Sequence, residues 1–257
     1  GEEVQVSLTT GLQGTSGASL DSAYVWRFLT AAGAGPGKFS APRNFGTGSD
    51  STYSTALGDV DGDGDLDVAA GNSAEQNIVY LNDGSGNLTA GTRNFGTGSD
   101  NSASVALGDV EGDGDLDVAT GNYGEQNVVY LNDGSGNFTA GTKNFGTGTD
   151  NTASVAFADV DGDGDLDIAV GNDNQQNVVY TNDGSGNFSA GSNFGPGSDR
   201  TYCLSVGDVD GDGDLDIAAG NVSSQQNVVY LNDGSGDFTG GSKNFGTGSD
   251  TTKSVSF

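Results

Sequence analysis

The sequence predicts an all-β protein of the β-propeller class, and three observations lead to this fold. First, the dipeptide Phe-Gly recurs at steps of 50, 50, 49 and 51 residues, a spacing typical of propeller blades. Second, each period contains four short strand-like runs separated by turns rich in Asp, Gly, Asn and Ser. Third, no segment has the 3.6-residue hydrophobic period of a helix. The Phe-Gly pairs begin at Phe45, Phe95, Phe145, Phe194 and Phe245.

The first repeat shows how one blade is built. Strands are predicted at residues 54–58, 67–71, 77–82 and 87–93. The third run, Asn-Ile-Val-Tyr-Leu-Asn, has the β-branched and aromatic residues of a central strand. Asp-Gly and Ser-Gly follow it and supply the positive φ angles that a tight hairpin requires. We therefore expect four antiparallel strands per blade.

An acidic loop joins the first and second predicted strands of each repeat. In the first repeat, residues 59–67 place carboxylates at positions 1, 3, 5, 7 and 9, with Gly64 at position 6. Alternate residues of such a loop can direct oxygens at one centre, and the glycine permits a turn that also directs the position-7 carbonyl there. The clustered carboxylates repel one another unless they hold a hard divalent cation, and six to eight oxygen ligands favour calcium over magnesium. No helical pattern flanks the loops, so they are not EF-hands.

The same loop occurs four times, which predicts about four Ca²⁺ sites. The predicted metal ligands are Asp59, Asp61, Asp63, Asp65, Asp67, Asp109, Glu111, Asp113, Asp115, Asp117, Asp159, Asp161, Asp163, Asp165, Asp167, Asp208, Asp210, Asp212, Asp214 and Asp216. Glu111 stands at position 3, where the other loops have Asp, and its extra methylene predicts an altered geometry or weaker affinity at the second site.

The repeated pattern resembles the FG-GAP/VCBS repeat of integrin α subunits and of many secreted microbial proteins. Phe-Gly is followed after about a dozen residues by Gly-Asp-Val-Asp-Gly-Asp-Gly-Asp-Leu-Asp and then by a strand of small residues. The resemblance covers residues 44–257 and implies a calcium-binding propeller. The Gly-Ala-Pro that names the family is replaced by Ala-Gly-Asn at residues 70–72, with related triplets in the other repeats, which favours the microbial branch.

Four complete repeats are predicted at residues 44–93, 94–143, 144–192 and 193–243. A fifth begins at residue 244 and reaches Phe257, where a calcium loop should follow. Residues 3–8, 23–29 and 37–46 match the remaining three strands. We therefore expect residues 1–257 to form a single domain of five blades, closed by a blade that combines 244–257 with 1–43 and lacks a calcium site. The alternative is a segment of a longer repeat protein.

The charge of the chain limits its partners and its location. The net charge is −28, which excludes nucleic acid and anionic membrane surfaces as partners. Long apolar runs are absent, so no membrane insertion is expected. The sequence starts without Met or a signal peptide, as in a processed secreted protein or an excised domain. Because extracellular calcium would fill the loops, we expect an extracellular or cell-surface location. The single cysteine, Cys203, is expected to be buried and inert.

The composition argues against an enzyme and for a binding module. The chain has no histidine, its basic residues are scattered, and calcium would engage its clustered carboxylates. Glu75 and Glu125 are interpreted as solvated surface residues. Tyr53, Tyr123 and Tyr202 lie near blade ends and can stack on sugars, although they do not recur as a repeated pocket. We expect a non-catalytic binding or adhesion module, for glycans or surface proteins. The alternative is a self-assembling structural subunit of an extracellular filament or surface array.

Overall fold

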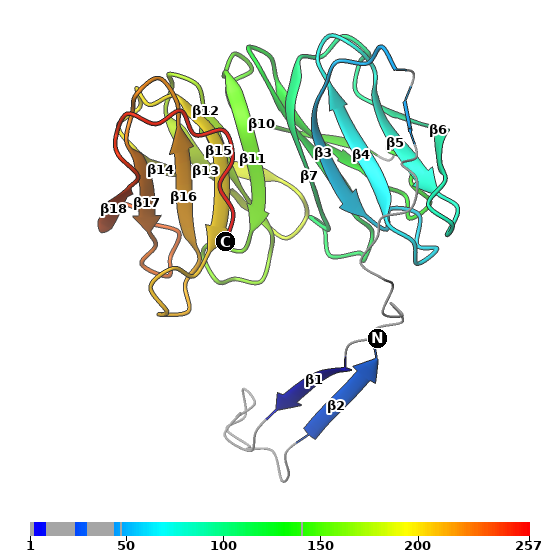
Figure 1. Ribbon diagram of the computed structural model, residues 1–257, viewed down its shortest axis with the longest axis horizontal. Coiled ribbons are helices and arrows are strands. Elements are labelled where there is room, and N and C mark those ends of the chain that lie inside the picture. The colour runs from blue at the N-terminus through cyan, green and yellow to red at the C-terminus, as the bar shows by residue number, and fades with distance from the viewer. Residues whose placement is uncertain (1–2, 9–23, 30–43, 47, 140) are drawn as a thin grey trace. The chain divides into compact units, whose positions relative to one another are not determined.

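Four antiparallel sheets of four strands each follow one another along the chain (Figure 1). The computed structural model describes residues 3–8, 24–29, 44–46, 48–139 and 141–257, and these divide into two compact units, Gly1–Asn44 and Phe45–Phe257. All four sheets belong to the second unit. Within the described residues every regular element is a β-strand, as the sequence predicts, and no helix could span a membrane.

Each sheet corresponds to one predicted repeat, with its strands in chain order. The first contains β3 (Thr52–Gly58), β4 (Asp67–Asn72), β5 (Asn77–Asn82) and β6 (Leu88–Phe95). The second contains β7 (Ser102–Gly108), β8 (Asp117–Asn122), β9 (Asn127–Leu131) and β10 (Gly141–Phe145). The third contains β11 (Thr152–Ala158), β12 (Asp167–Asn172), β13 (Asn177–Asn182) and β14 (Phe188–Phe194). The fourth contains β15 (Thr201–Gly207), β16 (Asp216–Asn221), β17 (Asn227–Leu231) and β18 (Gly241–Phe245).

Neighbouring sheets meet through their first strands. β3 contacts β7, β7 contacts β11, and β11 contacts β15, so the first strands stand side by side on the inner edge of the array. Four-stranded antiparallel sheets arranged in this way are consistent with the blades of a propeller. The second strand of each sheet is buried at every residue, which explains its small side chains.

The recurring Phe-Gly pair packs one blade onto the next. Phe95 ends β6 of the first blade, and its ring centroid lies 5.6 Å from that of Tyr130 in β9 of the second blade. Phe145 contacts Tyr180 in the same way. Such tilted and edge-on aromatic pairs add stability beyond the burial of their area. The 50-residue recurrence therefore reflects one repeated contact between blades.

The segment at residues 251–257 forms no strand, yet it lies where the first strand of a further blade would lie. The Thr252 N–H donates to the Asn221 carbonyl at 3.1 Å. A Cβ on Gly220 would lie 2.8 Å from Thr252 Cγ2 and 3.2 Å from Val255 Cγ1. Likewise, a Cβ on Gly71 of the first blade would lie 2.7 Å from Val105 Cγ1 of β7. The segment therefore lies against the fourth blade as β7 lies against the first.

The N-terminal unit contains the hairpin of β1 (Glu3–Leu8) and β2 (Tyr24–Leu29), which pair in antiparallel register from Glu3–Leu29 to Leu8–Tyr24. Two of the predicted N-terminal strands are therefore present. The predicted strand at residues 37–46 falls mostly outside the described residues. The single domain, the five blades and their closure by both termini remain predictions.

Candidate functional site

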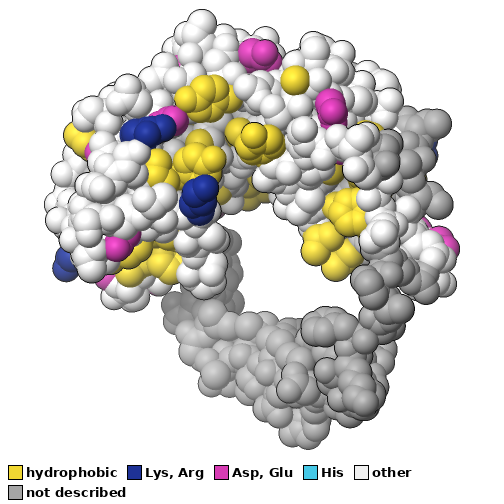
Figure 2. Space-filling model, turned by 45° about the horizontal axis from the view of Figure 1, so that its top comes forward, with side chains coloured by type: hydrophobic (Ala, Val, Ile, Leu, Met, Phe, Trp, Pro, Cys, Tyr) yellow, Lys and Arg dark blue, Asp and Glu magenta, His cyan; other side chains and the backbone are white. Residues whose placement is uncertain are grey.

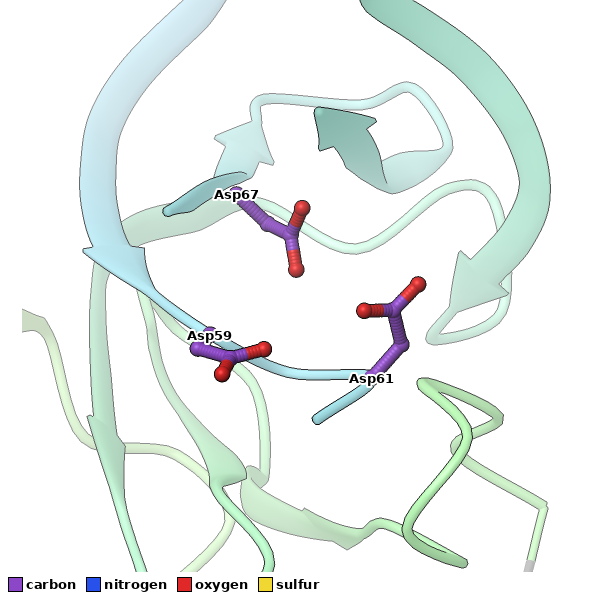
Figure 3. A group of neighbouring side chains, drawn as sticks. All are labelled: Asp59, Asp61 and Asp67. Carbon is purple, nitrogen blue, oxygen red and sulfur yellow. The ribbon is translucent and has the colours of Figure 1, made fainter. Parts of the chain in front are cut away.

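The acidic loops bring three of their five carboxylates together. In the first blade, Asp59 follows β3, Asp67 begins β4, and Asp61 lies between them (Figure 3). One oxygen from each of these side chains lies within 4.8 Å of the others. Positions 1, 3 and 9 converge equally in two other loops. These further groups are Asp159, Asp161 and Asp167, and Asp208, Asp210 and Asp216.

Backbone N–H groups hold the outer two carboxylates in place. Asp59 accepts hydrogen bonds from Gly62 and Gly64, both at 2.9 Å, and these bonds fold the loop around it. The two glycines have φ values of +75° and +93°, which other residues rarely adopt. Asp67 accepts from Val60 at 3.0 Å and from Asn82 at 2.8 Å. The carboxylates are therefore oriented by the loop itself.

The electrostatics of these loops suit a cation. Burial raises the pKa of Asp67, and the nearby charges of Asp61 and Asp63 raise it further against the lowering effect of its hydrogen bonds. The same causes raise the pKa of Asp117 and of Asp167 to about 6. A buried anion among like charges is stabilised by a bound cation. The donors are hard carboxylate oxygens, so the loops fit a divalent ion such as Ca²⁺ or Mg²⁺.

The second loop differs from the others at Glu111. Within the described part of the chain, its carboxylates are not among the groups that converge within this distance. The Asp113 N–H donates to Asp109 at 3.2 Å, whereas the corresponding N–H of Asp63 donates to Asp61 at position 3. The longer Glu side chain does not make this short-range contact. A weaker metal affinity at this loop remains a prediction.

Positions 5 and 7 are not part of the converging groups of the described residues. Asp63 accepts a hydrogen bond from the Asp65 N–H at 2.9 Å. The Asp65 carboxylate faces the hairpin of its own blade, where a Cβ on Gly84 would lie 2.6 Å from its Oδ2. The predicted ligands outside the three converging groups are Asp63, Asp65, Asp109, Glu111, Asp113, Asp115, Asp117, Asp163, Asp165, Asp212 and Asp214.

Each of the first three loops is also covered by the hairpin of the next blade. Asn132 Nδ2 donates to the Val60 carbonyl at 2.8 Å. In the next two blades Asn182 Nδ2 donates to the Val110 carbonyl and Asn232 Nδ2 to the Val160 carbonyl. Val60 is 2% exposed. Val209, its counterpart in the fourth loop, is 44% exposed. The acidic loops therefore form part of the contact between blades.

A cavity lies at the opposite end of the first strands. Its volume is about 530 Å³, within the range of small-molecule sites. All four blades contribute to its wall. The lining residues are Tyr53, Ser54, Asn101, Ala103, Ser104, Tyr123, Ala153, Ser154, Asp173, Arg200, Tyr202 and Lys253. The three tyrosines singled out in the sequence thus come together in one cavity, although no repeated motif marks them. Figure 2 shows hydrophobic and basic side chains close together on the face of the sheets that is turned toward the viewer.

A β-bulge near the start of each first strand places one residue in the cavity wall. In β3, Thr52 pairs with Asn72 and Ser54 pairs with Gly71, so Tyr53 between them is skipped. The same shift skips Ala103, Ala153 and Tyr202. Bulges commonly redirect a side chain toward a site. The bulged residues vary from blade to blade because the sheet does not use them for pairing.

Charged groups that the sequence did not reveal line the same cavity. Arg200 donates from Nε to Asp173 Oδ1 at 2.6 Å and from Nη2 to Oδ2 at 3.0 Å. The guanidinium holds the pKa of the Asp173 carboxyl below its usual value, and Tyr123 Oη also donates to this carboxylate at 3.0 Å. Lys253 Nζ lies 5.8 Å from the centre of the Tyr202 ring, a cation–π contact. A comparison of the repeats would have marked Lys253, since it aligns with the bulged positions.

Glu75 and Glu125 hold turns in place, and Cys203 is partly buried. Glu75 accepts from the Ser51 N–H at 3.0 Å and Glu125 from the Asn101 N–H at 3.1 Å, and Gln175 accepts the same bond in the third blade. These side chains fix the turn before the first strand, and a charge is not needed for that. Cys203 is half-buried, and burial raises the pKa of its thiol. A raised pKa disfavours the reactive thiolate.

The chain belongs to the FG-GAP-like repeat family. The family model matches four times, at residues 59–120, 109–170, 159–219 and 208–257. A search of curated proteins found no match. Among solved structures, BBS1N in complex with ARL6DN, soaked with lead, is similar at 12% identity and a TM-score of 0.49, over 73% of this chain and 56% of that chain.

A second solved structure is the Vibrio cholerae biofilm matrix protein Bap1. It is similar at 18% identity and a TM-score of 0.43, over 69% of this chain and 26% of Bap1. The chain therefore spans about half of the BBS1N chain and about a quarter of Bap1. Likenesses of this strength support no conclusion about activity or partners.

Proposed function

We propose that this protein is an extracellular, calcium-stabilised propeller that binds carbohydrate without transforming it. The observation that carries the proposal is the cavity in which Tyr53, Tyr123 and Tyr202 converge from three blades. Tyrosine rings offer flat, rigid faces with a polar end, which suits the apolar face and hydroxyl rim of a sugar. Asn101 and Ser104 in the same wall provide hydrogen-bonding partners for hydroxyl groups.

Calcium has a structural role in this proposal. The loops follow the far ends of the first strands, whereas the cavity lies where those strands begin. The metal therefore acts on the blades and on the contacts between them, and sugar binding depends on it through folding. If the loops bind calcium as weakly as extracellular modules do, they are filled only outside cells, which agrees with an extracellular location.

The cavity is poorly suited to glycoside hydrolysis. Most such enzymes need two carboxyl groups, one of them protonated, on either side of the scissile bond. Asp173 is the single carboxylate among the lining residues, and Arg200 and Tyr123 engage it. Incubation of the calcium-loaded protein with polysaccharides should release no reducing ends and no unsaturated products. Products that increase in proportion to protein would contradict a non-catalytic role.

The binding proposal is tested on a glycan array with the calcium-loaded protein, followed by calorimetry on the best ligand. Tyr123→Ala and Tyr202→Ala should each weaken binding about fivefold, since each stacking contact is worth on the order of 1 kcal/mol. Tyr123→Phe keeps the ring and should retain most of the affinity. Unchanged melting temperatures would show that the variants fold. The absence of binding to any glycan, or equal affinity in the Ala variants, would overturn the proposal.

The alternative function, a subunit of an assembly, is favoured by apolar residues at the two ends of the four-blade array. Leu57 on β3 is 66% exposed, and Phe257 beside the fourth blade is 64% exposed. If copies join through these ends, the solution mass will rise with protein concentration. Leu57→Asp should then return the protein to a monomer. A concentration-independent monomer mass would contradict assembly and leave the binding proposal in place.

A further inference from the structure

We propose that the ligand of the tyrosine-lined cavity is an acidic sugar whose carboxylate is held by Lys253 and Arg200. This inference rests on the proposed function, because it names the class of carbohydrate that the cavity takes. The distribution of acidic and basic residues supports this ligand class. The chain carries 36 acidic and 8 basic residues, yet two of those basic residues line this one cavity beside one carboxylate.

The three charged groups in the wall have different roles. Asp173 and Arg200 neutralise each other in an ion pair with Nε–Oδ1 at 2.6 Å. Among the described residues no carboxylate lies within ion-pair distance of Lys253, and its ammonium lies over the Tyr202 ring instead. The formal charge of the wall is therefore +1 in a chain of −28. An anionic ligand meets repulsion over most of the protein and attraction in the cavity.

Arg200 is held in a fixed orientation and still has donors to offer. Its Nε and Nη2 donate to Asp173, and its Nη1 donates to Ser223 Oγ at 2.6 Å. A guanidinium has five N–H donors, so one on each Nη atom is left for a ligand. A carboxylate is the planar acceptor that two such donors recognise best. The Lys253 ammonium lines the same cavity and adds a second positive charge.

The comparison of repeats supports the same assignment. Lys253 aligns with the bulged residues Tyr53, Ala103, Ala153 and Tyr202, and Arg200 aligns with Ser51, Asn101 and Asn151. None of these counterparts carries a charge. The packing of a blade therefore does not require a basic residue at either position. The two cations distinguish this side of the cavity from the others, and a ligand-specific role accounts for both.

The test compares uronic-acid oligosaccharides with their carboxyl-reduced neutral counterparts, using the full chain with calcium held constant. The acidic oligosaccharide should bind about tenfold or more tightly, and this preference should fall as sodium chloride is raised. Lys253→Gln should abolish most of the preference, and Lys253→Arg should keep it. The matched control is Lys243→Gln, an equal charge change at an exposed lysine of β18 that does not line the cavity.

The outcomes separate this inference from the proposed function. Equal affinity for the acidic and the neutral oligosaccharide in the unmodified protein would overturn the acidic ligand and leave sugar binding standing. A preference that survives Lys253→Gln, or that Lys243→Gln removes equally, would overturn the assignment of the cations. Stronger binding of sulfated than of uronic-acid oligosaccharides would show that the cavity prefers a sulfate group, and would overturn the carboxylate as the group it recognises. The absence of binding to every sugar would overturn both proposals.

Discussion

At the scale of single residues, one methylene group distinguishes the second acidic loop from the other three. Glu111 replaces Asp at position 3, and its loop is not among the convergent groups of the described residues. The backbone of the loop is otherwise preserved, since Gly112 and Gly114 donate to Asp109 as their counterparts do in the first loop. Only the side chain thus distinguishes this site, which makes its effect measurable.

Replacement of Glu111 by Asp should therefore raise the calcium affinity of one site several-fold and leave the other three unchanged. The physical reason is that the shorter side chain can join the position-1 and position-9 carboxylates without displacing the loop. Calorimetric titration would follow the change. The reciprocal variant Asp161→Glu should weaken the third site to a similar extent. Identical titrations for all three proteins would show that position 3 does not control affinity.

Residues of the cavity show the limits of sequence analysis at this scale. Tyr53, Tyr123 and Tyr202 stand out because they interrupt a repeated pattern, and this is a local signal. Asp173 and Arg200 give no such signal as a pair. They lie 27 residues apart and meet only because the third blade packs against the fourth. The acidic loops are the opposite case, since their carboxylates lie within nine residues of one another in the sequence.

At the scale of elements, the strands were predictable and their fine register was not. The predicted runs in the first blade differ from β3, β4, β5 and β6 by two residues or fewer at each end, because Gly-rich turns punctuate them. The shift between Thr52 and Ser54 leaves no mark in the hydrophobic pattern. That shift is what directs Tyr53 into the cavity wall. The contact between a metal loop and the next hairpin is likewise absent from the pattern.

This contact between blades should be measurable with a matched pair of variants. Asn132→Ala removes the bond to the Val60 carbonyl and should lower the free energy of unfolding by about 1–3 kcal/mol, because it leaves a buried carbonyl unpaired. Asn82 holds the same position in the first blade, and its Nδ2 donates to Leu66 of its own loop. Asn82→Ala should therefore lower the free energy of unfolding by a smaller amount. Urea unfolding in calcium would measure both, and equal losses would contradict a special role for the bond between blades.

The raised pKa values of the loop carboxylates predict a pH dependence for the metal-free protein. In the fold the pKa of Asp117 and of Asp167 is about 6, above the ordinary value of 3.8. The folded state then binds more protons than the unfolded chain between these values, so stability falls as pH rises from about 4 to about 6. The lowered pKa values of Asp83 and Asp133 act below this window.

Thermal melts with chelator should accordingly give a higher midpoint at pH 5 than at pH 7. With calcium the order should reverse, because protons compete with the metal for the same carboxylates. The loop double variant Asp117→Asn/Asp167→Asn provides the control, since it cannot titrate at these positions and should flatten the dependence. A metal-free midpoint that rises between pH 5 and pH 7 would show that the carboxylates are not destabilised by burial.

At the scale of the whole molecule, calcium should act on every blade and on the contacts between them. Twenty of the 36 acidic residues lie in the four loops, and four calcium ions would change the formal charge from −28 to −20. Each site that binds only the folded state adds about 2.7 kcal/mol at a hundredfold excess of metal over its dissociation constant. For a chain of this size that is a midpoint increase on the order of 10 °C for one site.

Melts in calcium and in chelator check this directly, with magnesium as the comparison ion. We expect a large increase with calcium and a smaller one with magnesium, which needs a more regular set of six ligands. The increase should drop in steps as Asp59, Asp159 and Asp208 are replaced by Asn in combination. An unchanged midpoint in calcium would mean that the acidic loops are not metal sites under these conditions.

The last prediction concerns closure by the segment at residues 251–257. Thr252 and Val255 lie against Gly220, and a Cβ on Gly207 would lie 2.9 Å from the Phe257 ring. β7 makes the corresponding contacts with Gly71 and Gly58 of the first blade. The segment therefore covers the side of the fourth blade. If both termini share a fifth blade, deletion of residues 251–257 uncovers that side and deprives the N-terminal strands of their partner.

The deletion should therefore cause aggregation or a loss of cooperative unfolding, because unpaired strand edges and apolar surface become exposed. It should also speed the reaction of Cys203 with a thiol reagent, since the thiol lies 3.9 Å from the Thr252 carbonyl. A control that replaces the exposed Thr251 and Ser256 by Ala keeps the contacts of Thr252, Val255 and Phe257 with the fourth blade and should behave as the unmodified protein. A truncated chain that stays monomeric, melts cooperatively and protects Cys203 would favour an open array within a longer repeat protein.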